Sequence, residues 1–338
     1  MLPRRSRRDD KRFGDVPWVA WPSVLSLDAV IVAVVWQQWL MRTFCQRGST
    51  WGESAALAAT VWLIYVADRL LDAASLNLSR PHSLRHRFYR RHARFFLALW
   101  IVVLVVDTII VVRFLPPQLI REGLVVAVAV LVYGASVHFR RAVMTSQWDG
   151  AADLARPSLT IPKEVRVGVL FAAGVSLSAW SELMTRRNSG IDAGLEDGDW
   201  VGLVSATLAM AILFTSNCLL VAFFERRLDR AQSFASVASG VDDPHGRLAR
   251  AVGSRFRTPV LAASVIAFAV LLIPLPTPFR IVVLCCAFGL IVLAKRSLRS
   301  ESIPEMDSDA VRSTFDVRGV WVDVVLWLPP VVMIGWFS

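Results

Sequence analysis

Two pairs of carboxylates, each with a four-residue spacing, are the residues of this 338-residue sequence best suited to chemistry. One pair is Asp68 and Asp72, and the other is Glu225 and Asp229. On a helix this spacing places both carboxylates of a pair on one face, about 6 Å apart, where they repel each other. Mg²⁺ would offset the repulsion, because it binds a few carboxylate oxygens and completes its coordination with water and phosphate oxygens. The spacing therefore predicts a catalytic, metal-binding set that clamps a pyrophosphate. The alternative is that these acids are interfacial charges that end a span and take part in no reaction.

Both pairs occur in the same five-residue pattern, which is an acid followed by Arg, any residue, Leu and Asp. The two copies are residues 68–72 and 225–229, and each ends an apolar segment and precedes a basic loop. The copies end the second and the sixth predicted helices, and this even displacement of four helices preserves the direction in which the chain crosses the membrane. We therefore expect two parallel four-helix repeats followed by one further helix.

Further polar residues within the apolar segments are candidates for a substrate pocket. Asn217 precedes Glu225 by eight residues and therefore lies on the same helical face, deeper in the membrane. Its amide either lines a cavity or bonds a neighbouring helix, and the sequence leaves both interpretations open. Asp28 is the best candidate for a pocket wall, because acids within spans usually face the interior of a bundle. Asp107 and Asp323 are further acids of this kind, with partners that the sequence does not identify.

A basic segment follows the first acidic pair and suits an anionic substrate. Within it we select Arg80 and Arg85 as substrate-binding candidates, since guanidinium groups match phosphate oxygens. Lys163 begins a later apolar segment and would lie level with the acidic pairs, either to bind substrate or to snorkel to the membrane surface. Topology and contact with anionic lipid headgroups account for the other arginines. The three histidines of the segment are expected to be solvated and not to bind metal: His82, His86 and His92.

The elements that must position these residues are transmembrane helices. Hydrophobic residues make up 55% of the chain and the mean hydropathy is +0.52. Apolar runs of about twenty residues, the length that crosses ~30 Å of hydrocarbon as a helix, recur along the sequence. We predict an all-α integral membrane protein with about nine transmembrane helices in a bundle. It would have a basic cytosolic N-terminal tail, residues 1–17, and a single polytopic domain, residues 18–338. The predicted spans are 18–41, 52–73, 94–113, 119–139, 165–184, 200–223, 258–275, 279–295 and 318–337.

The net charge of +10 is distributed in a way that indicates membrane topology and not nucleic-acid binding. With the N-terminus in the cytosol, seven of the 37 Lys and Arg residues would lie outside. We therefore predict a multi-pass protein of the cell (plasma or inner) membrane with a cytosolic N-terminus, an external C-terminus and membrane lipids as neighbours. The seven external residues would be Arg42, Arg47, Arg113, Arg121, Arg186, Arg187 and Arg280.

Taken together, these motifs resemble the UbiA-type superfamily of intramembrane prenyltransferases. Members of that superfamily have nine transmembrane helices and two Asp-rich motifs on the second and sixth helices. Asp68 and Asp72 match the last two acids of the first motif, and Glu225 and Asp229 stand where the second motif belongs. Two further residue pairs match less specific features of the family. Arg80-Pro81 resembles its loop after the first motif, and Lys163-Glu164 resembles the start of its fifth span. The sequence departs from the family where Ile64 and Tyr65 replace the Asn that usually opens the first motif, and where Glu225 replaces Asp.

The resemblance implies an enzyme that transfers a prenyl group from an isoprenoid pyrophosphate to a hydrophobic acceptor within the membrane, with Mg²⁺ as cofactor. The metal, with Lys163 and the loop arginines, would neutralise the leaving pyrophosphate. Asp28 would orient the acceptor, whose identity the sequence does not specify. The alternatives are a membrane transporter with intramembrane acids, which parallel repeats also suit, and a non-catalytic membrane scaffold.

Overall fold

The chain is built from α-helices throughout the part that the structure describes. The computed structural model describes residues 18–76, 83–146, 161–189, 197–232, 275–300 and 318–336, and no strand occurs among them. The predicted all-α class is therefore confirmed for these residues. A short 3-10 turn (Trp18–Ala20) precedes the α-helices, which are α1 (Trp21–Val24), α2 (Asp28–Cys45), α3 (Trp51–Ala74), α4 (Leu84–Arg91), α5 (Ala93–Phe114), α6 (Pro117–Ser146), α7 (Lys163–Ser189), α8 (Asp197–Gln232), α11 (Thr277–Ser300) and α12 (Arg318–Trp336).

Seven helices are long and apolar enough to cross a membrane: α3, α5, α6, α7, α8, α11 and α12. An eighth span is added if the bent segment that ends in α2 is counted as one. These helices expose large apolar side chains on their outer faces, such as Ile101, Val102 and Val105 of α5. This is the pattern of a multi-pass membrane protein, in which hydrocarbon covers the outside. All but the last residue of the predicted span 258–275 lie outside the described residues, so the total of nine stays a prediction.

The first predicted span, 18–41, is not one straight helix. The segment Trp18–Val24 meets α2 at an angle of 80°, and Ser26 at the break has a positive φ of 58°. The Ser26 hydroxyl hydrogen bonds to the Tyr89 hydroxyl at 3.2 Å, and the Trp62 indole N–H donates to the Leu25 carbonyl at 3.2 Å. Contacts from α3 and α4 therefore stabilise a bend that apolar patterning does not reveal.

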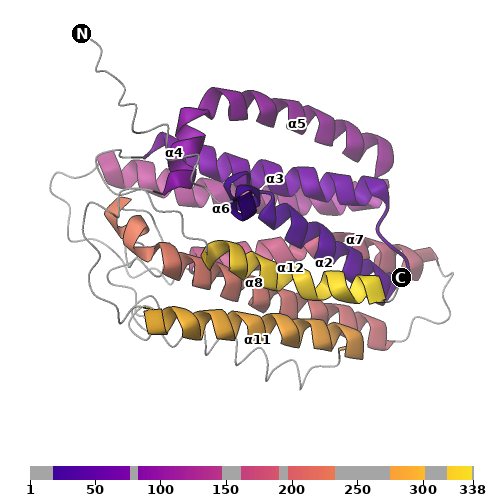
Figure 1. Cartoon of the computed structure of the whole chain (residues 1–338). Helices are drawn as coiled ribbons and strands as arrows, with labels where there is room; N and C mark the ends of the chain where they lie inside the picture. The colour runs from indigo at the N-terminus through magenta and orange to yellow at the C-terminus, as the bar shows by residue number, and fades with distance from the viewer. Residues whose placement is uncertain are drawn as a thin grey trace, which may run out of the picture.

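The helices lie nearly parallel in a bundle, with α4 at one end and the α2–α3 connection at the other (Figure 1). Helix α2 contacts α3, α7 and α12, and α7 packs along α8. Trp36 of α2 is fully buried and meets Phe214 and Phe279 edge-on, each with ring centroids 5.8 Å away. Gly168 permits the close approach of α7 and α8, because a Cβ there would lie 2.7 Å from the Thr215 Cα.

Helix α12 contains two consecutive prolines, Pro329 and Pro330. Proline has no N–H, so the carbonyl of Leu326, four residues before Pro330, lacks its usual helical donor. The indole N–H of Trp36 donates to this carbonyl at 2.9 Å, and the thiol of Cys286 approaches it at 3.7 Å. Side chains from α2 and α11 therefore satisfy a backbone group that α12 cannot satisfy itself.

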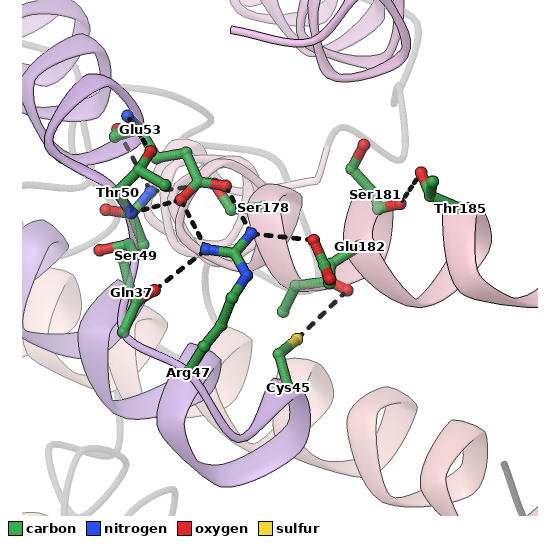
Figure 2. A network of polar contacts seen from close by, with 12 residues as sticks. Gln37, Cys45, Arg47, Ser49, Thr50, Glu53, Ser178, Ser181, Glu182 and Thr185 are labelled. Carbon is green, nitrogen blue, oxygen red and sulfur yellow. Dashed lines mark hydrogen bonds and ion pairs between the residues drawn. The ribbon is translucent and has the colours of Figure 1, made fainter. Parts of the chain in front are cut away.

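At the end of the bundle away from α4, an ion network around Arg47 links α3 to α7 (Figure 2). The Arg47 guanidinium donates to Glu53 of α3 at 3.0 Å and to Glu182 of α7 at 2.9 Å. Thr50 and Glu53 form a capping box that begins α3. Hydrogen bonding to the Glu53 carboxylate raises the pKa of Arg47 further above its ordinary value. Arg186 joins the same network through Glu182, so two of the arginines assigned to one side of the membrane lie at one end of the molecule.

Candidate functional site

The opposite end of the bundle is organised by α4, the short basic helix that packs against α3 and α5. Ser83 caps its N-terminus, with the hydroxyl accepting a hydrogen bond from the His86 N–H at 3.2 Å. Arg90 and Arg91 lie in its last turn, where cations are favoured by the helix dipole. On the side that faces the bundle, Tyr89 is fully buried, and burial raises the pKa of its phenol. The basic segment identified in the sequence is therefore in part an anchored helix.

Two side chains of α4, Arg85 and His86, each lie beside an acid on another helix. The Arg85 guanidinium lies 2.7 Å from Glu225 of α8, and the His86 Nε2 lies 3.8 Å from an Asp72 oxygen of α3. Arg85 is 9% exposed and His86 is 5% exposed. The expectation that His86 is solvated is therefore wrong: the serine cap and the packing of α4 place its ring inside the protein.

Arg69 joins the acids of α3 and α8 into one electrostatic group. Its guanidinium is deeply enclosed and lies within electrostatic range of Asp68, Glu225, Asp72 and Asp28. Its Nε–H is buried and has no hydrogen-bond partner among the described residues. Arg69 was not selected from the sequence, although it is the second residue of the pattern shared by the two acidic pairs. A basic residue inside an acidic motif was the signal that could have identified it.

A second polar group lies deeper in the bundle and joins α2, α8 and α12. The Asn217 side-chain N–H donates to Asp323 at 3.2 Å, and Asp28 is within hydrogen-bonding range of the same Asp323 carboxyl. The Ala29 N–H donates to Asp28 at 2.8 Å at the start of α2. Asn217 and Asp28 were selected from the sequence as pocket residues, and the structure places both against Asp323.

Helix α7 contributes Lys163 and Glu164 to the same end of the bundle. Both lie within electrostatic range of Cys218 on α8, and Glu164 is buried. Tyr133 of α6 lies within electrostatic range of Glu164 and of Asp68, which connects α7 to the acids of α3. Lys163 therefore lies near Cys218 of α8, and its position level with the acidic pairs stays a prediction.

The remaining selected residues are not part of these two polar groups in the described structure. Arg80 and the side chain of Asp229 lie outside the described residues. Asp107 of α5 accepts a hydrogen bond from the Thr60 hydroxyl at 2.9 Å, so it connects α5 to α3 away from the two groups. The four cysteines are free, and they are Cys45, Cys218, Cys285 and Cys286.

The carboxylates at the α4 end fit Mg²⁺ in donor type. All are oxygen donors, and Mg²⁺ takes one or two protein carboxylates when substrate phosphates complete its coordination. Within the described residues, no three side chains of the metal-binding types come together. Asp72 and Glu225 instead face His86 and Arg85, whose side chains occupy the positions next to these carboxylates. Any Mg²⁺ held by these carboxylates would therefore need most of its ligands from water or from a bound phosphate.

The comparisons with known proteins add no identification. The chain matches no family model, no curated protein and no solved structure.

Proposed function

We propose that this protein is an intramembrane prenyltransferase that uses Mg²⁺ to transfer the prenyl group of an isoprenoid pyrophosphate to a hydrophobic acceptor. One observation carries the proposal: α4 places Arg85 against Glu225 and His86 against Asp72, so acids from two separate helices meet a guanidinium and an imidazole from a third at one end of the bundle. Such mixed charge is suited to a metal-bound anion, because carboxylates bind the metal and guanidinium groups bind the phosphate oxygens.

The topology belongs to the same proposal. Nine spans would form two parallel four-helix repeats and one further helix, with the N-terminus in the cytosol and the C-terminus outside the cell membrane. Of the acids that the two repeats would contribute, Asp68, Asp72 and Glu225 lie around the single guanidinium of Arg69. The separation of Arg47 and Arg186 from Arg85 along the bundle agrees with a site on one membrane side.

The role of each side chain follows from its position. Asp68, Asp72, Glu225 and Asp229 would hold Mg²⁺, which neutralises charge on the departing pyrophosphate. Arg85 would exchange its partner Glu225 for phosphate oxygens, and Lys163 and Arg80 would bind the remaining phosphate charge. His86 would orient the Asp72 carboxylate. The prenyl chain would lie along the apolar bundle interior, where low polarity strengthens these ionic contacts.

The purified full chain in lipid vesicles tests the proposal. Labelled geranylgeranyl diphosphate is supplied with membrane lipid extract as the source of acceptor, with Mg²⁺ or with excess chelator. We expect a labelled prenyl lipid and free pyrophosphate only when Mg²⁺ is present. If the donor is bound but recovered unchanged, the transferase proposal fails. If the donor crosses the vesicle membrane intact, the transferase proposal also fails and the protein is a transporter.

A further inference from the structure

Three polar side chains from three helices meet deeper in the bundle than the acidic pairs. Asp28 is contributed by the start of α2, Asn217 by α8 and Asp323 by α12, so residues 295 positions apart in sequence are brought together. Asp28 and Asp323 are within hydrogen-bonding range, and Asn217 donates to Asp323. Charged groups from other elements also surround them, because Arg69 of α3 lies within electrostatic range of Asp28, and Arg85 of α4 lies within range of Asp323.

A second, independent observation indicates that this group meets a ligand. The Oδ1 atom of Asn217 is fully buried and has no hydrogen-bond partner among the described residues. A buried acceptor without a donor destabilises the protein unless a ligand or water supplies one. Tyr65, Arg69 and Asp323 are also surrounded by protein, yet each keeps some accessible surface. All three lie within electrostatic range of Asp28, so they surround the same polar group as Asn217.

The hydrogen bond between the two carboxyl groups constrains what they can offer a ligand. Two ionised carboxylates cannot hydrogen bond to each other, so this contact requires a proton between Asp28 and Asp323. Such a pair offers one donor and one strong acceptor, and the Asn217 carbonyl offers another acceptor. This combination suits a neutral hydroxyl group. It disfavours a carboxylate or phosphate, which would bring a like charge into the same small space.

We propose that Asp28, Asp323 and Asn217 form the acceptor end of the site, where they orient the hydroxyl group of a neutral lipid-soluble alcohol or phenol and receive its proton. This assignment rests on the proposed prenyl transfer. The bond between the allylic carbon and the pyrophosphate oxygen breaks, and its electron pair leaves with pyrophosphate. A lone pair of the acceptor oxygen forms the new carbon–oxygen bond. The hydroxyl proton passes to the ionised carboxylate of the pair and is later released to solvent.

Asp28→Asn and Asp323→Asn test this assignment in the full chain in lipid vesicles. The measurements are Mg²⁺-dependent binding of geranylgeranyl diphosphate and formation of prenyl product from neutral and acidic fractions of membrane lipids. We expect the parent protein to form product only from the neutral fraction. Product formation should fall about 100-fold or more in each variant, as for removal of a general base. Donor binding in each variant should stay within about twofold of the parent. Asp107→Asn is the matched control, because Asp107 is also a buried acid within a span but bonds Thr60, and it should change neither quantity.

A readout independent of catalysis accompanies these measurements. Infrared spectra of the parent protein should contain a protonated carboxyl band that shifts in D₂O, and each Asn variant should lose it. The assignment is overturned if the parent lacks the band, if the variants keep full product formation, or if they lose donor binding. If the parent protein binds no donor at all, the proposed function itself fails and the acceptor assignment fails with it. Normal donor binding with unaffected product in both variants overturns the acceptor assignment alone.

Discussion

The guanidinium of Arg85 is almost fully buried and lies 2.7 Å from Glu225, which makes this ion pair a sensitive position in the candidate site. Glu225→Gln keeps the shape of the side chain but leaves a buried cation without its charged partner. Breaking a buried pair on one side costs about 3–5 kcal/mol, and the partial exposure of Glu225 reduces this. We expect the free energy of unfolding to fall by about 1–3 kcal/mol, measured by denaturation of the purified protein in detergent.

The double variant Arg85→Gln/Glu225→Gln provides the control for this pair. With both charges removed, no buried ion is left uncompensated, so the double variant should be more stable than the sum of the single effects predicts. Strictly additive effects would show that the two side chains do not interact in the membrane-embedded protein.

Asp72→Asn and Asp229→Asn should each abolish prenyl transfer while the protein still folds and inserts. Each substitution keeps the size and most hydrogen bonding of the side chain but removes the charge that Mg²⁺ requires. The loss should resemble that produced by a chelator in the vesicle assay. His86→Ala should lower activity less, because the ring contacts Asp72 and is assigned no contact with substrate. Full activity of both Asn variants would mean that these acids are merely interfacial charges.

Residue type and spacing were enough to select several members of the candidate site, but not their partners. Asp72, Glu225, Arg85 and Asn217 were all selected from sequence. Asp323 was noted without a role, because its partners on α2 and α8 lie more than a hundred residues away along the chain. His86 was misassigned because a histidine in a basic segment is usually solvated, and only the packing of α4 buries it.

At the scale of the helices, the contact between α7 and α8 depends on Gly168. A Cβ at this position would lie 2.7 Å from the Thr215 Cα, so backbone atoms and not a flexible side chain would have to move. We expect Gly168→Ala to separate α7 from α8 and to destabilise the protein by about 1–3 kcal/mol, as overpacking does. The measurement is the same detergent denaturation.

Gly174 on the same helix is the matched control. A Cβ at Gly174 would meet no heavy atom within 4 Å. Gly174→Ala should therefore be neutral or stabilising by up to about 1 kcal/mol, because Ala has the higher helix propensity. Equal destabilisation by both substitutions would contradict close packing at Gly168.

Long apolar helices were predictable because membrane spans have a composition unlike any other element. The shorter features were not. The break at Ser26 depends on contacts with Tyr89 and Trp62, which come from other helices. Helix α4 is only eight residues long and strongly basic, so no hydrophobic pattern indicates it. Features that depend on tertiary contacts therefore required the structure.

At the scale of the whole molecule, the charge distribution predicts that the N-terminus is cytosolic and that the C-terminus is external. Reporter fusions at each end test this prediction, using one reporter that is active only in the cytosol and another active only outside. A fusion at Ser338 should report an external position. A cytosolic Ser338 would mean that the number of spans is even, and the segment around Pro274, Pro276 and Pro278 is where the count should first be revised.

The contact between Trp36 and the Leu326 carbonyl has a consequence for biogenesis. Helix α2 is synthesised before α12, and the two bonded positions are 290 positions apart in the sequence. When α12 leaves the translocon, the Leu326 carbonyl has no helical N–H donor, because Pro330 has no N–H, and hydrocarbon offers none. An earlier helix thus supplies the donor that a later helix lacks, so this contact forms only after both helices have been synthesised. A nascent chain halted before residue 318 would already contain Trp36, but its indole N–H would still lack the acceptor that α12 provides.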